Sequence, residues 1–392
     1  MTRVLSDRLG NRSVRRDPLE SRDVDMDARH HGRALLAVVA SVLVVAACTG
    51  AGPGSSAVVG TPSASAALVD GSSGPKASES TAAPAPICRD LKPPWAAAAS
   101  HPNDRVRDPE GRILFGPISR SDEIIGQVIA PLYSMDADGS DLAKVFDCDL
   151  ERPRISPDGS RIAFSIAIKD GTWQVATISA DGSDLRILTS TTGYAETPDW
   201  SPDGSWLIYA ATPVPCSREP LCPSLNESLW RMNADGSDQR LVGSTPASAW
   251  DWEPRLSPDG REVVFVRNTP EDNYRWKVMI LNLESGQERV ATNDARDVEH
   301  PDWSSDGTFI VYNVSPGGPI ERIPVDDPTA AAEVLAGDAI HVAYKPAYSP
   351  DGSSIVFGCD GKVCRMIADG SDVVEIFAAS DLLNHFDWGI AP

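Results

Sequence analysis

Residues 198–209 read PDWSPDGSWLIY, and close copies of this phrase recur through the later part of the chain. The core of the phrase is Ser-Pro-Asp-Gly, or Ser-Ser-Asp-Gly in one copy, and it begins at Ser156, Ser201, Ser257, Ser304 and Ser349. These start positions are separated by 45, 56, 47 and 45 residues. A nearly fixed period of this size indicates one supersecondary unit that is copied several times.

Each copy predicts a β-hairpin. Asp-Gly accepts the positive φ of a tight turn, and the β-branched and aromatic run that follows it, such as Trp206–Tyr209, is typical of a strand. A Pro lies two residues before the last apolar residue of the preceding segment. We expect this Pro to be a strand's first residue, where its missing N–H does no harm.

A second phrase, Ala-Asp-Gly-Ser-Asp, alternates with the first and predicts a second hairpin. Its copies begin at Ala137, Ala180, Ala234 and Ala368. Each repeat therefore contains four strands, which is one blade of a β-propeller.

The two ends of the repeat region complete each other. Arg112–Phe115 resembles a second strand that has no first strand, and His385–Gly389 resembles a first strand with nothing after it. The predicted fold is all-β: a six-bladed β-propeller of four-stranded blades over residues 105–392. One blade shared between the N- and C-terminal ends closes the ring and removes the open sheet edges.

The consensus Pro-x-Trp-Ser-Pro-Asp-Gly-x-x-Ile-x-Phe, followed by Met-x-Ala-Asp-Gly-Ser-Asp, resembles the TolB-type β-propeller repeat, a WD40-like Pro-Asp repeat. The resemblance covers about residues 105–392 and implies the propeller fold. It implies little about function, because such blades serve many unrelated tasks.

The front of the chain has a different composition. Residues 34–47 are apolar and uncharged behind Arg29 and Arg33, which predicts a secretory signal rather than a membrane span. Val45-Ala46-Ala47-Cys48 resembles a bacterial lipoprotein signal, in which Cys48 is lipidated; the alternative is an ordinary signal with an incidental Cys. Residues 1–33 are a polar n-region or a misassigned start. Residues 48–104 are rich in Ala, Ser, Pro and Gly and predict a disordered linker.

The lipoprotein interpretation implies a protein held on the extracytoplasmic side of the cell membrane by its lipid. Disulfides are permitted in that compartment, and six of the seven Cys remain once Cys48 is set aside. The expected pairs are Cys88–Cys148, Cys216–Cys222 and Cys359–Cys364, with other connectivities left open. The chain has no Cys-x-x-Cys, so these residues do not indicate a metal site.

The formal net charge is −21, and much of it comes from Asp in the repeated turns. A solvated acidic surface accounts for this charge. Nucleic acid is not expected as a partner, because no basic stripe is present to neutralise phosphates.

Ligands of propellers usually bind at the mouth of the central channel, which the first strands line. The residue that precedes the Pro in each first strand, with its counterpart in the last strand, differs from copy to copy: Arg152, Thr197, Glu253, His300, Lys345 and His385. Two residues further on stand Arg154, Asp199, Arg255, Asp302, Ala347 and Asp387. We expect the first set to form a ring of mixed charge with two imidazoles, which is a candidate binding site. The alternative is that these residues pair with one another and hydrate the channel.

The favoured function is a non-enzymatic module, expected to be monomeric, that binds a protein or another component of the cell envelope. No catalytic residue, cofactor or metal ligand is assigned.

A second hypothesis is an enzyme at the channel mouth that acts on a carbohydrate, since a family of metal-dependent pectin-fragment lyases has similar repeats. His300 and His385, with Asp302 and Asp387, would then hold the metal. A third hypothesis is a sensor of a small ligand. A serine hydrolase is not expected, because the chain has no Gly-x-Ser-x-Gly.

Overall fold

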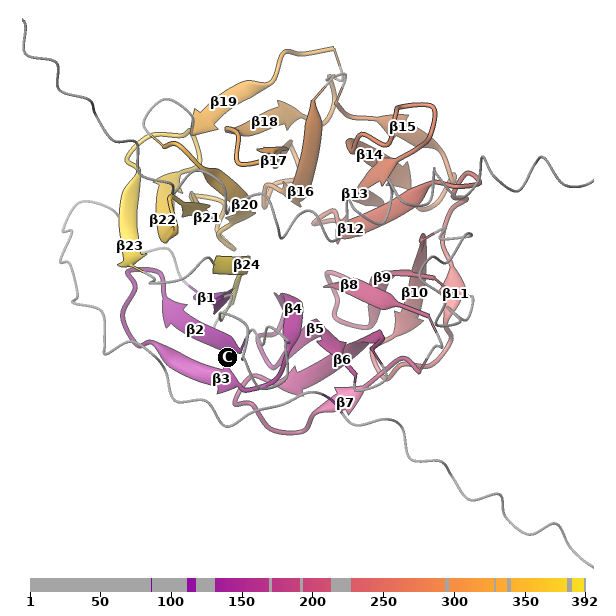
Figure 1. The fold of residues 1–392 in the computed structure, drawn as a ribbon, viewed down its shortest axis with the longest axis horizontal. Coiled ribbons are helices and arrows are strands. Elements are labelled where there is room, and N and C mark those ends of the chain that lie inside the picture. Colours follow the sequence, from indigo (N-terminus) through magenta and orange to yellow (C-terminus); the bar gives the residue numbers. More distant parts are fainter. Residues whose placement is uncertain are drawn as a thin grey trace, which may run out of the picture. The chain divides into compact units, whose positions relative to one another are not determined.

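A computed structural model of the chain describes residues 86, 111–117, 131–168, 171–190, 193–212, 227–292, 296–327, 329–336, 340–378 and 383–390. Its strands form six four-stranded antiparallel sheets arranged as blades around a centre (Figure 1). The predicted six-bladed propeller is confirmed. None of the described residues is helical, and the described part therefore has no helix long and apolar enough to span a membrane.

The six blades follow the chain in order, each from its innermost strand outward. Blade 1 consists of β24 (Leu383–Gly389), β1 (Arg112–Pro117), β2 (Leu132–Asp136) and β3 (Ala143–Phe146). Blade 2 consists of β4 (Leu150–Ile155), β5 (Arg161–Ala167), β6 (Trp173–Ser179) and β7 (Arg186–Ile187). Blade 3 consists of β8 (Ala195–Trp200), β9 (Trp206–Ala211), β10 (Ser228–Asn233) and β11 (Arg240–Leu241).

The second half of the ring repeats this arrangement. Blade 4 consists of β12 (Trp250–Leu256), β13 (Glu262–Asn268), β14 (Lys277–Asn282) and β15 (Glu288–Val290). Blade 5 consists of β16 (Asp297–Trp303), β17 (Phe309–Ser315), β18 (Ile320–Pro324) and β19 (Glu333–Ala336). Blade 6 consists of β20 (Ala343–Tyr348), β21 (Ser354–Cys359), β22 (Lys362–Ile367) and β23 (Val374–Ala378).

Blade 1 closes the ring as the repeat count predicts. The last strand, β24, pairs antiparallel with β1, with Ile113 opposite Trp388 (Figure 1). Apolar packing closes the ring as well, because Val356 and Phe377 of blade 6 share a buried cluster with Phe115 of blade 1. Similar clusters fill the spaces between the other neighbouring blades. The hydrophobic core is therefore distributed around the ring and leaves the centre to polar side chains.

The Ser-Pro-Asp-Gly phrase builds a self-contained turn. In each of the five copies the Ser hydroxyl donates to the Asp carboxylate at 2.6–2.7 Å. A backbone N–H after the Gly donates to the same carboxylate oxygen at 2.9–3.0 Å. Hydrogen bonds from Ser156 and Ser201 lower the pKa of Asp158 and Asp203 to about 2. These Asp residues therefore serve the turns and are not part of a shared site.

The prolines of the first strands do not begin those strands, so the expectation for them was wrong. Pro153 lies inside β4, which starts at Leu150, and Pro301 lies inside β16, which starts at Asp297. In both strands the register with the neighbouring strand shifts at the Pro. A β-bulge leaves an unpaired residue, so a Pro there removes no ladder hydrogen bond.

One predicted disulfide lies within the described residues. Cys359 and Cys364 are bonded across the β21–β22 hairpin. Cys148 is also disulfide-bonded. The pairs Cys88–Cys148 and Cys216–Cys222 stay predictions because Cys88, Cys216 and Cys222 lie outside the described residues. The same holds for Cys48 and for the segments proposed for residues 1–33, 34–47 and, apart from Pro86, 48–104.

Candidate functional site

The innermost strand of every blade contains one residue in the left-handed backbone region. Their φ values lie between 52° and 60°. They are the six residues singled out in the sequence: Arg152, Thr197, Glu253, His300, Lys345 and His385. None is Gly, Asn or Asp, the residues that tolerate this conformation best. Each non-Gly residue there costs about 1–3 kcal/mol, a strain that typically persists at functional sites.

Five of these six residues line one cavity of about 350 Å³, and Thr197 is not among its lining residues. Its lining residues belong to β4, β12, β16, β20 and β24, which are the innermost strands of five blades (Figure 1). Residues at the second set of positions line it too, namely Arg154, Arg255, Asp302 and Ala347. Pro301, Pro346 and Phe386 complete the lining, although the Phe386 ring itself packs in the apolar cluster between blades 6 and 1. The structure thus brings most of both predicted sets together in one concavity.

Arg152, Glu253 and His300 form a buried cluster across the channel. The Glu253 carboxylate contacts the Arg152 guanidinium and lies 2.6 Å from His300 Nδ1. It also accepts the backbone N–H of His300 at 2.8 Å. Arg152 Nη1 lies 2.7 Å from the same Nδ1, and the Arg152 guanidinium stacks over Trp252 at 4.6 Å. Three of the six ring residues therefore hold each other in place.

This cluster has a defined charge state near neutral pH. Burial raises the pKa of Glu253, but the charges of Arg152 and His300 outweigh it and bring that pKa down to about 2. Burial lowers the pKa of His300 to about 4, with Glu253 opposing this shift and Arg152 adding to it. The cluster therefore contains an ionised Glu253 and an uncharged imidazole at pH 7.

The remaining ring residues are held mainly through neighbouring strands. The backbone N–H of Thr197 donates to Ser165 Oγ at 2.8 Å, and that of Lys345 donates to Asn313 Oδ1 at 3.1 Å. His385 Nε2 lies 3.6 Å from the Glu151 carboxylate. The preceding blade therefore fixes the backbones of Thr197 and Lys345, whereas His385 contacts the following blade, and Lys345 and His385 are among the residues that line the cavity.

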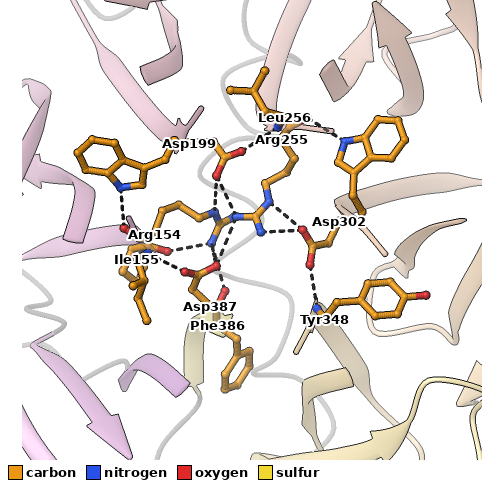
Figure 2. A network of polar contacts seen from close by, with 12 residues as sticks. Arg154, Ile155, Asp199, Arg255, Leu256, Asp302, Tyr348, Phe386 and Asp387 are labelled. Atoms are coloured by element: carbon orange, nitrogen blue, oxygen red, sulfur yellow. Dashed lines mark hydrogen bonds and ion pairs between the residues drawn. The ribbon is translucent and has the colours of Figure 1, made fainter. Parts of the chain in front are cut away.

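Arginine and aspartate alternate between neighbouring blades at the second set of positions. Going around the ring, the residues are Arg154, Asp199, Arg255, Asp302, Ala347 and Asp387. Figure 2 shows the two guanidinium groups meeting at the centre between the three carboxylates. Arg255 donates to Asp302 at 2.6 and 2.9 Å and lies 3.4 Å from Asp199 and 3.5 Å from Asp387. Ala347 stands where a third Arg would complete the alternation.

Each of these carboxylates also joins two blades. Asp387, Asp199 and Asp302 accept the backbone N–H groups of Ile155, Leu256 and Tyr348, each at 2.8 Å (Figure 2). Trp200 and Trp303 donate their indole N–H groups to the carbonyls of Arg154 and Arg255. Aspartate and tryptophan of one Pro-Asp-Trp segment therefore reach the blades on either side.

Three carboxylates against two guanidinium groups leave an excess of negative charge in a buried place. Burial raises the pKa of Asp387 to about 6, although Arg255 opposes the shift. Burial and the charges of Asp387 and Asp302 raise the pKa of Asp199, against the hydrogen bond from Leu256. Both carboxylates therefore take up a proton at a higher pH than an exposed Asp does, which removes part of the excess charge as the pH falls toward 6.

The metal hypothesis gains no support from the geometry. Within the described part of the chain, no three His, Cys, Asp or Glu residues converge in a way that could hold a metal ion. His300 contacts Glu253 and Arg152, a cation that disfavours a second cation nearby. Sequence reasoning missed Glu151 and Glu299, which lie beside the two imidazoles. The sequence could have indicated them, because Glu151 directly precedes Arg152 and Glu299 directly precedes His300.

Comparison with known proteins agrees with this architecture. Residues 152–327 match the family described as the TolB beta propeller domain. The chain contains a TolB-type β-propeller domain. An uncharacterized protein of Agrobacterium fabrum is 26% identical over 165 residues, which cover 40% of this chain and 52% of that protein. The Tol-Pal system protein TolB of Francisella tularensis is 25% identical over 171 residues, 44% of this chain and 36% of that protein.

Solved structures show the same fold. TolB from Acinetobacter baumannii aligns with a TM-score of 0.55 and 17% identity, over 71% of this chain and 66% of that chain. At this identity the likeness concerns the fold alone. The matched region covers about half, or less, of the length of the two curated relatives named above. The activities and partners of those whole proteins therefore cannot be assigned to this chain from the match.

The left-handed ring positions allow a direct test of strain. We expect Lys345→Gly to leave the free energy of unfolding unchanged or to raise it by up to about 1 kcal/mol, because Gly adopts positive φ without a Cβ penalty. The matched control is Lys362→Gly in β22, which should lower it by about 1 kcal/mol, since Gly weakens a regular strand. Urea unfolding of both variants measures the effect, and a larger loss at position 345 than at 362 would contradict it.

Proposed function

We propose that this chain is an exported lipoprotein, anchored on the extracytoplasmic side of the cell membrane through Cys48, whose propeller binds a protein or another envelope component at the channel mouth. One observation carries the binding part. Six equivalent positions have a backbone conformation that suits Gly, yet they carry six charged, polar or imidazole side chains, five of which line one cavity. A purely structural role would favour the same small residue in every copy.

The similar proteins support a role in the cell envelope. One of them is named as a Tol-Pal system protein, and we propose a comparable role within an envelope assembly for this chain. A channel mouth on a rigid ring is a suitable place for a partner segment to enter, because its side chains are positioned before binding and lose little entropy. The linker expected at residues 48–104 would give the propeller reach from its anchor.

Photo-crosslinking in intact cells tests the binding site. p-Benzoylphenylalanine is placed at position 345, inside the cavity, and at position 241 in β11, where Leu241 is exposed on the outermost strand. We expect irradiation to give a discrete protein adduct from position 345 and not from position 241. No adduct from position 345, or the same adducts from both positions, would contradict the proposal.

Cell fractionation tests the anchor. Replacing Cys48 with Ala removes the only thiol of the proposed lipidation motif, so the protein should move from the membrane fraction to the soluble fraction. Mass spectrometry of the wild-type protein should show the added acyl mass on Cys48. If the variant stays with membranes and the wild-type protein carries no acyl group, the anchor is wrong.

A further inference from the structure

The channel-mouth cavity differs in charge from the rest of the protein. Its lining includes four side chains that are positively charged at neutral pH, Arg152, Arg154, Arg255 and Lys345, and two carboxylates, Glu253 and Asp302. The whole chain carries a formal net charge of −21. These cations favour an anion at the cavity of an otherwise acidic protein, with part of their charge compensated by Asp199 and Asp387, which lie 3.4–3.9 Å from Arg154 and Arg255.

Two guanidinium groups of this lining also have N–H donors that no described residue accepts. The Nε–H groups of Arg152 and Arg154 are buried and have no hydrogen-bond acceptor among the described residues. The Arg152 side chain is only 9% exposed. The Asp199 carboxylate lies 3.9 Å from Arg154 Nε, which is too far for a hydrogen bond. A buried unsatisfied donor is costly, so the site favours a molecule that supplies acceptor oxygens.

The carboxylates behind the cavity oppose this preference less than exposed carboxylates would. Burial raises the pKa of Asp387 to about 6 and also raises the pKa of Asp199, so both bind a proton more readily than an exposed Asp does. Asp199 and Asp387 are the carboxylates that face Arg154. When either is protonated, Arg154 keeps its full positive charge with less compensation.

The size and walls of the cavity restrict the anion. The cavity is small, because the space among its lining atoms is only about 350 Å³ even when the part open to solvent is counted. We therefore expect it to admit a single carboxylate group rather than a long polymer. Pro301 and Pro346 narrow it beside the charged residues, and the Phe386 carbonyl accepts from Arg154 at 3.2 Å. An extended polyanion would also meet the acidic surface outside the cavity, which repels it.

We propose that the cavity binds a carboxylate presented by a short acidic segment of the protein partner. This inference rests on the proposed function and names the chemistry that the partner must offer. Arg side chains pair well with carboxylates because their planar donors match two acceptor oxygens. Lys345 supplies a further positive charge at the same cavity.

Binding of matched synthetic peptides to the purified propeller tests the inference. The probe is N-acetyl-Gly-Glu-Phe-Glu-Gly-amide, and its control replaces both Glu residues with Gln. We expect calorimetry to detect the Glu peptide at a Kd below about 5 mM and to show no binding of the Gln peptide, because a buried ionic contact is worth roughly tenfold or more in affinity. Lys345→Ala should weaken binding at least about tenfold, whereas Lys362→Ala, which removes a surface cation paired with Glu375, should not.

Two further arms separate the sources of the carboxylate. Free glutarate should bind more weakly than the Glu peptide, and equal affinity would overturn the assignment to a peptide segment. Polygalacturonate is the third probe, and its binding in place of the Glu peptide would point to an acidic glycan instead. Equal behaviour of the Glu and Gln peptides, whether both bind or neither does, would overturn the preference for a carboxylate.

The identity of the segment crosslinked at position 345 distinguishes failure of this inference from failure of the proposed function. The crosslinked segment of the partner can be sequenced, and we expect an Asp or Glu within about three residues of the adduct, the reach of one extended side chain and its neighbours. An adduct on a segment without acidic residues would overturn the inference and leave the proposed protein-binding role intact. Absence of any adduct would instead count against that role.

Discussion

Replacing Arg255 with Met is expected to lower the free energy of unfolding by about 3–5 kcal/mol, the usual cost of removing one partner of a buried ionic network. Arg255 contacts all three carboxylates at the centre of the ring, at distances from 2.6 to 3.5 Å (Figure 2). Met keeps most of the side-chain volume and removes only the charge and donors. Asp302 then loses its close cation, while all three carboxylates stay buried.

The matched control is Arg261→Met. Arg261 lies in a repeated turn, with its side chain 78% exposed and 3.8 Å from Asp259. An exposed pair of this kind contributes about 0–1 kcal/mol, so this variant should unfold almost like the wild type in urea. A similar small effect at Arg255 would mean that the central network does not hold the blades together.

Replacing Glu253 with Gln should have the second largest effect, a loss of about 3–5 kcal/mol, because Arg152 stays buried without its carboxylate. Arg152→Gln should be comparably destabilising for the opposite reason. In the double variant neither charge remains, so it should be much more stable than the sum of the single effects predicts. The cycle therefore measures the coupling between the two side chains, and urea unfolding at pH 7 supplies its four free energies.

The pH dependence of this coupling has a definite sign. The pKa of Glu253 is about 2 in the folded protein and 4.5 for a free Glu side chain. Its stabilising contribution is therefore complete above pH 4.5 and is lost as the pH falls through 2, so the coupling should be smaller at pH 3 than at pH 7. The exposed pair Lys362–Glu375 serves as the control, with a coupling below about 1 kcal/mol. Equal coupling energies for the two pairs would contradict the account of the buried cluster.

The blade count was predictable because turn chemistry is local. Ser304, Asp306 and Gly307 make their turn from their own hydrogen bonds, so each copy of the phrase marks one hairpin wherever it stands. The ring residues could also be located from the sequence, because they differ from copy to copy whereas the residues around them are nearly the same in every copy. His300 and Lys345 stood out in this way and do line the cavity.

Other features depend on contacts between blades and were hidden from sequence reasoning. Pro301 was expected at a strand end, but β16 continues before it, because a bulge with His300 at positive φ accommodates the missing N–H. The role of Glu253 as the partner of both Arg152 and His300 joins blades 2, 4 and 5, which are far apart in the chain. Such convergence depends on how the six blades close into a ring and does not follow from the spacing of the repeats.

The central claim is that the residues that differ between copies form the binding site, whereas the repeated residues build the fold. The most direct measurement is the affinity of the crosslinked partner for the Lys345→Gly variant, compared with wild type and with Asp306→Ala in a repeated turn. We expect Lys345→Gly to keep its stability and lose at least about tenfold in affinity, the usual scale for removing one charged contact. Asp306→Ala should lose stability and keep its affinity. Unchanged partner affinity in Lys345→Gly would contradict the claim.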